Sequence, residues 1–113
     1  MRVDKDYVNK VGELSDQALA VAGRLRKRKR LNYGETQFFA GHVFRGAQKI
    51  MSDPGSLTAH VDACACVNIA FGFALTIEDV ELIDVTCPLK DLIESHFKEA
   101  LQNKEEGDKS NEV

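Results

Sequence analysis

The sequence predicts an all-α fold, a single-domain bundle of four or five helices. In three long segments, apolar residues recur at alternating steps of three and four, which is the spacing of one face of a helix. Only two prolines and eight glycines interrupt the 113 residues, so long helices are allowed. This length fits one domain. We assign the bundle to residues 1–102 and expect the polar segment 103–113 to be a disordered tail.

The first helix is expected from about Asp4 to Arg30. Asp4 is a good N-cap residue, and the basic residues at the far end complement the helix dipole. Asn32 and Gly34 are residues typical of a helix end. An unbroken apolar stripe suits a helix that packs lengthwise on another one. The stripe consists of Tyr7, Val11, Leu14, Ala18, Val21 and Leu25.

The second helix is expected from about Glu35 to Met51, and the turn sequence SDPG at 52–55 ends it. Two long helices joined by a short turn should lie antiparallel. The apolar face of this helix consists of Phe39, Ala40, Val43, Phe44, Ala47, Ile50 and Met51.

The uncharged stretch 63–75, ACACVNIAFGFAL, is expected in a third helix that begins after Ser56. Beyond residue 63 this helix is apolar on every side, which predicts a central position enclosed by its neighbours. Cys64 and Cys66 would then be packing material. Large and small residues alternate at 67–75, so a β-strand is the alternative for this stretch.

Residues 76–87 are acidic and fit either a short helix or an extended connection. Pro88 is a good first residue of a helix, so the last helix is expected to begin there. Its apolar face consists of Leu89, Leu92, Ile93, His96, Phe97, Ala100 and Leu101.

The composition favours a cytoplasmic protein without membrane association. The longest uncharged run, 63–77, has about fifteen residues, whereas a membrane span needs about 20. The first ten residues lack the apolar core of a signal peptide. The cysteine count is three, and Cys64 and Cys66 are too close in sequence to suggest a disulfide framework.

A basic run at 24–30 is the first candidate site, because such clusters bind the phosphates of nucleic acid or other polyanions. The alternative is a solvated helix end attracted to the acidic remainder of the chain. Residues 1–30 hold nine Lys or Arg against four Asp or Glu, whereas 31–113 hold six against fourteen. The basic residues of the run are Arg24, Arg26, Lys27, Arg28, Lys29 and Arg30.

A polar pocket around His96 is the second candidate. His96 lies at the centre of an apolar helix face, as does Asn68, and the two could line a cavity or form a core pair that fixes helix register. His60 and Cys64, four residues apart, share a helix face and complete this candidate set. We expect no metal site or cofactor, because the paired cysteine spacing of zinc sites is absent.

The acidic residues Glu78, Asp79, Glu81 and Asp84 have a three-residue spacing that could serve magnesium, although a solvated acidic face is the simpler interpretation.

The segments RVDKDYVNKVGELSDQAL, near the start, and NIAFGFAL, at 68–75, resemble a small archaeal helical-bundle family of unknown function. Ala70, Gly72 and Phe73 match the alanine-x-glycine-large pattern that ends that family's helical hairpin. The similarity covers residues 2–77. Phe71 and Leu75 stand where that family has aspartate or tyrosine, so the resemblance implies a helical bundle and carries over no functional residues.

Together these features predict a non-enzymatic protein that acts by association, as a homodimer or with a protein partner. The regular stripe of the first helix motivates this prediction. One alternative is binding of nucleic acid or another polyanion through 24–30. Another is a small-molecule or metal-dependent enzyme with a pocket near His96 and Asn68. No catalytic residue is assigned.

Overall fold

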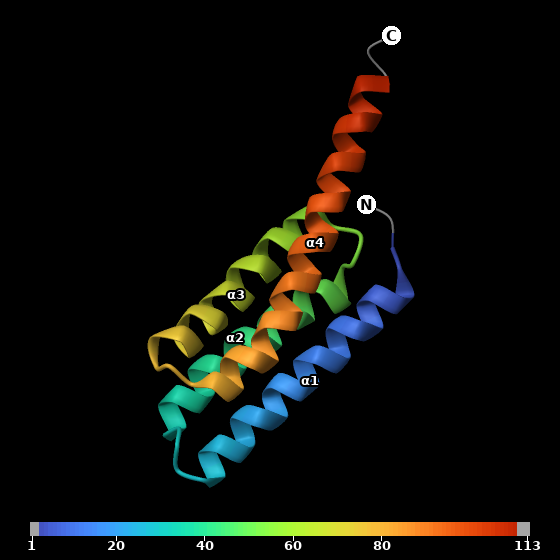
Figure 1. The fold of residues 1–113 in the computed structure, drawn as a ribbon. Coiled ribbons are helices and arrows are strands. Elements are labelled where there is room, and N and C mark those ends of the chain that lie inside the picture. The colour runs from blue at the N-terminus through green and yellow to red at the C-terminus, as the bar shows by residue number, and fades with distance from the viewer. Residues whose placement is uncertain (1–2, 111–113) are drawn as a thin grey trace.

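Four helices form an up-and-down bundle in this computed structural model, which describes the backbone of residues 3–110 and the side chains of residues 3–103 (Figure 1). The helices are α1 (Lys5–Lys27), α2 (Tyr33–Ser52), α3 (Leu57–Thr76) and α4 (Val80–Ser110). Each packs against two others, so α1 and α3 lie on one diagonal and α2 and α4 on the other. The described residues contain no strand, which confirms the all-α prediction and the helical interpretation of 63–75.

Side-chain caps begin the first three helices. Asp4 caps α1, and Ser56 caps α3 by accepting a hydrogen bond from the backbone of Ala59. Asn32 was expected to help end the first helix, but it begins α2. Its carboxamide oxygen accepts from the Glu35 N–H at 2.8 Å, and the Glu35 carboxylate accepts from the Asn32 N–H at 3.0 Å. This reciprocal capping box satisfies two N–H groups that would otherwise lack a partner.

Two helices end in the same way, with a residue of positive φ. Lys29 (φ 61°) follows α1, and Glu78 (φ 55°) follows α3. After α1, the N–H of Arg30 bonds the carbonyl of Leu25, and the N–H of Lys29 bonds that of Arg26. The segment after α3 repeats this pattern with Asp79 and Glu78 as donors. Both are Schellman motifs, built without the glycine that usually holds the left-handed position.

The bundle core is continuous across all four helices and includes the complete apolar stripe of α1. The first-helix seam expected from the sequence is therefore used inside the chain, against α2 and α4, and is not available to a partner. The fully buried large side chains include Leu25, Phe39, Ile50, Leu82, Leu89 and Ile93.

The expectation that α3 is a central, enclosed helix is wrong. In a four-helix bundle a helix has two neighbours, and those of α3 are α2 and α4. Only the side of α3 that faces the core is covered, so Val61, Ile69 and Leu75 remain 51%, 46% and 49% exposed. Because this helix is apolar on every side, it was expected to be covered on every side. In this bundle its outer side faces water.

The last helix begins earlier and ends later than expected. Pro88 was expected to begin it, but Pro88 lies inside α4. The ring removes the N–H that would bond the carbonyl of Asp84; Asp84 is exposed, so water can bond that carbonyl instead. Residues 103–110 continue α4 where a disordered tail was expected, because adding turns to an existing helix costs far less than starting one. Residues 111–113 lie outside the described residues.

Candidate functional site

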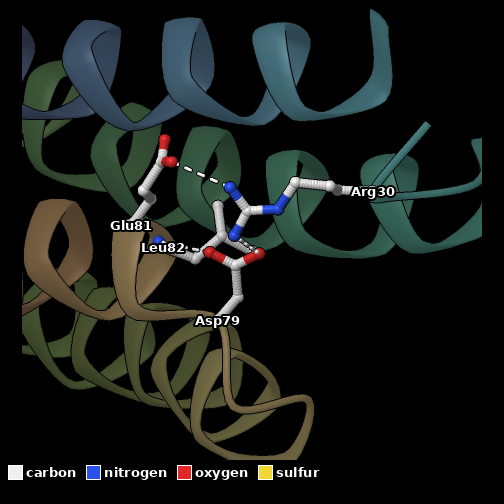
Figure 2. Close-up of polar contacts among 4 residues, drawn as sticks. All are labelled: Arg30, Asp79, Glu81 and Leu82. Atoms are coloured by element: carbon white, nitrogen blue, oxygen red, sulfur yellow. Dashed lines mark hydrogen bonds and ion pairs between the residues drawn. The ribbon is translucent and has the colours of Figure 1, made fainter. Parts of the chain in front are cut away.

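The basic run lies at one end of the bundle, and its last residue joins it to the acidic part of the chain. The Arg30 guanidinium donates from Nη2 to Asp79 Oδ2 at 2.9 Å and from Nη1 to Glu81 Oε1 at 2.8 Å (Figure 2). These bonds, first of all the one to Glu81, raise the pKa of Arg30. The charge asymmetry of the sequence therefore corresponds, at this position, to an attraction within the chain.

The same contact aligns two helix ends. Arg30 and Asp79 occupy equivalent places in the two Schellman motifs, directly after Lys29 and Glu78. Asp79 is buried and also accepts a hydrogen bond from the N–H of Leu82, so it caps α4 (Figure 2). Asp79 and Glu81 therefore have structural roles. Among the described side chains, no group of three His, Cys, Asp or Glu is placed to hold a metal ion.

The other basic residues of the run, Arg24, Arg26, Lys27, Arg28 and Lys29, are exposed. The guanidinium of Arg26 lies 4.6 Å from the ring centre of Tyr33, which is itself 61% exposed. Tyr33 follows the run by three residues in the sequence. A cation stacked on an exposed aromatic ring is a common feature of surfaces that bind nucleobases.

Two residues of the predicted pocket, His60 and His96, come together at the opposite end of the bundle. They lie against Tyr7, which was expected to belong to the apolar stripe of the first helix. The Tyr7 ring of α1 stacks on His96 of α4 at 3.7 Å between centres and lies 5.8 Å from His60 of α3. The two imidazoles are 5.6 Å apart. This ring cluster, Tyr7, His60 and His96, joins three helices and connects α1 to α3 across the diagonal.

Two polar atoms of the ring cluster are buried without a hydrogen-bond partner, the Tyr7 hydroxyl and His60 Nε2. His60 Nδ1 lies 2.9 Å from the carbonyl oxygen of Ser56, which can only accept, so Nδ1 carries the proton of neutral His60. Burial lowers the pKa of His60, against the effect of the Ser56 bond, and raises the pKa of Tyr7. Burial also raises the pKa of the half-buried Cys64 thiol. Both shifts favour the neutral forms of Tyr7 and His60.

Of the other two predicted pocket residues, Cys64 lies near Tyr7, whereas Asn68 is elsewhere. Its side chain is exposed, and it donates to Glu94 Oε1 at 3.1 Å rather than facing His96. Glu94 also accepts from Lys90 at 3.1 Å. The structure therefore does not assemble the proposed set of His96, Asn68, His60 and Cys64 around one cavity.

The most extensive unassigned surface is the outer face of α2 and α3, here called the α2–α3 face. Its apolar members are Phe38 and Phe44 on α2 and Val61, Ile69 and Leu75 on α3, all at least 44% exposed. Phe38 packs on Phe73 of α3, whereas Phe44, six residues further along α2, lies about 120° around that helix from Phe38. Single exposed apolar side chains are common on protein surfaces, and here five of them occur on two adjacent helices.

A groove of about 670 Å³ lies at one end of this face, between the end of α2 and the start of α3. Its lining includes Gly41, Phe44, Arg45, Lys49, Thr58 and Asp62. Lys49 Nζ lies 3.9 Å from Asp62 Oδ2 across the groove. By length and mean hydropathy, 1.4, α3 is also the helix of the described chain that could cross a bilayer, a test that core helices pass as well.

No family model matches this chain, and no curated protein or solved structure shows significant similarity to it.

Proposed function

We propose that this protein is a non-enzymatic helical bundle that acts by association, through the α2–α3 face, with a second copy or with a protein partner. A cytoplasmic location accompanies this proposal, supported by three cysteines that remain free thiols. The observation that carries the proposal is the exposure of Val61, Ile69 and Leu75 on a helix that has almost no charge.

Burial of such side chains is the main driving force of protein association. Each contributes about 1.5–3 kcal/mol when it moves from full exposure to full burial, and these are already about half covered. Three to five such residues on each partner therefore favour association by several kcal/mol, which opposes the entropic cost of binding.

Sedimentation equilibrium over a concentration series tests this function. We expect a reversible monomer–dimer equilibrium, and Ile69→Glu should weaken it at least about tenfold because a charge would be buried at the interface. Gln17→Glu, an exposed change on α1, is the matched control and should leave the equilibrium unchanged. A chain that stays monomeric at high micromolar concentration, and that retains no protein partner, contradicts the proposal.

Polyanion binding through 24–30 is a second candidate, supported by the exposed Arg26–Tyr33 pair and the four other exposed cations beside it. It predicts affinity for generic DNA or RNA that falls steeply with salt, and a shallower salt dependence in Lys27→Ala. Binding that is absent at low salt, or insensitive to salt, removes this candidate. The enzyme alternative near His96 and Asn68 has less support, because Asn68 is exposed and bonds Glu94, whereas His96 stacks on Tyr7.

A further inference from the structure

We infer that the end of α1 and the start of α2 bind single-stranded nucleic acid, with an unpaired base stacked on Tyr33 and the phosphates on the basic residues around it. This inference rests on polyanion binding, the second candidate function, and names its ligand. The surface, here called the basic surface, consists of Arg24, Arg26, Lys27, Arg28, Lys29 and Tyr33.

Positive charge is concentrated on the basic surface. Five exposed Lys or Arg lie within residues 24–29, and because a helix rises about 1.5 Å per residue, they are within about 8 Å of one another along the direction of α1. Among the described side chains, none of these five takes part in an ion pair. Each phosphate that such a cation binds releases a counterion from the nucleic acid, which favours binding at low salt.

The acidic residues at the same end of the bundle adjoin the basic surface without interrupting it. Four of them lie at the junction of α3 and α4: Glu78, Asp79, Glu81 and Asp84. Arg30 bonds two of these carboxylates (Figure 2). Glu35, at the start of α2, bonds the N–H of Asn32. Residues 24–33 contain six Lys or Arg and no Asp or Glu, so the positive charge forms a region of its own.

An exposed aromatic ring lies beside these cations. Tyr33 is the first residue of α2, is 61% exposed and takes no part in the core. The guanidinium of Arg26 lies over the ring, 4.6 Å from its centre, which holds the ring next to the cations. Cations at the end of α1 complement its helix dipole, but the dipole does not explain an aromatic ring held in water beside them. A binding site that includes bases explains both features.

The ring favours single strands over duplexes. In a duplex each base is stacked between its neighbours, whereas an unpaired base can stack on an aromatic ring or on an arginine guanidinium. Tyr33 and Arg26 offer both groups in contact with each other. Gln37 is exposed one helical turn after Tyr33, so its carboxamide can donate to and accept from the edge of a base.

Fluorescence anisotropy with labelled strands of about 15 nucleotides, a length above most single-strand site sizes, tests the inference on the full chain at low salt. The probes are oligothymidine DNA, oligouridine RNA and a DNA duplex of the same length. We expect at least one single strand to bind at least about fivefold tighter than the duplex, and the tighter of the two identifies DNA or RNA as the ligand. For five phosphate contacts, the slope of log affinity against log salt should approach about −3.5.

Variants separate stacking from charge, and each changes an exposed side chain, so circular dichroism should show native helix content. Tyr33→Ala should weaken single-strand binding at least about fivefold and leave binding of inorganic polyphosphate, which has no bases, unchanged. Tyr33→Phe keeps the ring and should bind like the native chain. Lys27→Ala should make the salt slope shallower by about 0.7. Lys10→Ala, the same change at the other end of α1, is the matched control and should not alter the slope.

The outcomes separate this inference from the candidate function on which it rests. Preference for the duplex, or unchanged single-strand binding in Tyr33→Ala, would overturn the single-strand inference and leave polyanion binding intact. Absence of binding to every probe at low salt overturns both. Association through the α2–α3 face is measured independently by sedimentation, because the residues of the basic surface are not members of that face.

Discussion

The diagonal helices α1 and α3 have opposite relations to water. Within α1, whose side chains are all described, no large apolar residue is fully exposed, and charged residues cover the outer side. The α3 helix has one charged residue, Asp62, and exposes Val61, Ile69 and Leu75. Both helices bury a core-facing side to a similar degree, so the difference lies on the outer sides. The spacing of apolar residues therefore predicts which side of a helix is buried. A helix that is apolar on every side need not be buried on every side.

The largest expected effect is on the free energy of unfolding, and it should differ between a leucine of α1 and a leucine of α3. Leu25 on α1 is fully buried, and Leu75 on α3 is 49% exposed. Leu25→Ala should lower the free energy of unfolding by about 2–5 kcal/mol, because it leaves a cavity in the core. Leu75→Ala should change it by less than about 0.5 kcal/mol when urea unfolding is followed on dilute, monomeric protein. Equal losses in the two variants would mean that α3 is enclosed after all.

Two glycines of the α2–α3 pair, Gly46 and Gly72, should respond to alanine substitution with opposite signs. Gly46→Ala forces a Cβ against Val67 Cγ2 and should cost about 1–3 kcal/mol of unfolding free energy. Gly72→Ala has open space and should stabilise the monomer by up to about 1 kcal/mol. Thermal unfolding of both variants at low concentration gives the measurement. A destabilised Gly72→Ala monomer would contradict the open outer side of α3.

The junction after α3 gives a smaller effect. Asp79 caps α4 through the Leu82 N–H, so Asp79→Ala should cost about 1 kcal/mol, within the range of N-cap substitutions. Asp84→Ala, an exposed acidic position in the same helix, is the matched control and should be nearly neutral. Chemical denaturation distinguishes them, and equal effects of the two changes would argue against capping.

The ring cluster predicts the smallest effect, a loss of stability in acid. Burial holds the pKa of His60 below its value in the unfolded chain, about 6.5. At a pH between these two pKa values, His60 is protonated in the unfolded chain and neutral in the folded chain. The stability contributed by neutral His60 is therefore complete above about pH 6.5 and decreases as the pH falls towards the folded-state pKa. Urea unfolding of the native chain and of His60→Gln at several pH values should show a smaller acid loss in the variant.

His42→Gln is the control for that measurement, because His42 lies far along α2 and takes no part in the ring cluster. A native chain whose stability does not change between about pH 7 and about pH 5 would contradict a buried, neutral His60.

Much of the fold follows from local pattern, and the failures have physical causes. The stripe of α1 and the cap at Ser56 depend on neighbouring residues, so the sequence shows them. The predicted apolar face of α2 is confirmed at Phe39, Val43, Ala47 and Ile50, but it is wrong at Phe44 and Met51, which are exposed. Asn32 was placed at a helix end, because Asn is common both after helices and as an N-cap; only its exchange of hydrogen bonds with Glu35 distinguishes the two. Pro88 was expected to begin a helix, yet a helix can include a proline where the freed carbonyl reaches water.

The candidate sites were harder to predict because they depend on contacts far apart in the chain. Arg30 is 49 residues from Asp79, and the charge imbalance showed that an attraction was possible without showing the pair. Tyr7 was assigned to an apolar stripe, and nothing local connects it with His60 or His96. The exposure of α3 depends on how many helices surround it, which composition alone does not determine.

The two tyrosines lie at opposite ends of the bundle, so their spectroscopic signals can be used to follow each end. The chain has no tryptophan and two tyrosines, of which Tyr7 is buried against His96 and His60 and Tyr33 is exposed beside Arg26. Near-ultraviolet circular dichroism depends on fixed aromatic packing, so most of this signal should come from Tyr7. With Tyr33→Phe, the spectrum would follow the detachment of the N-terminal end of the bundle alone, without any attached dye.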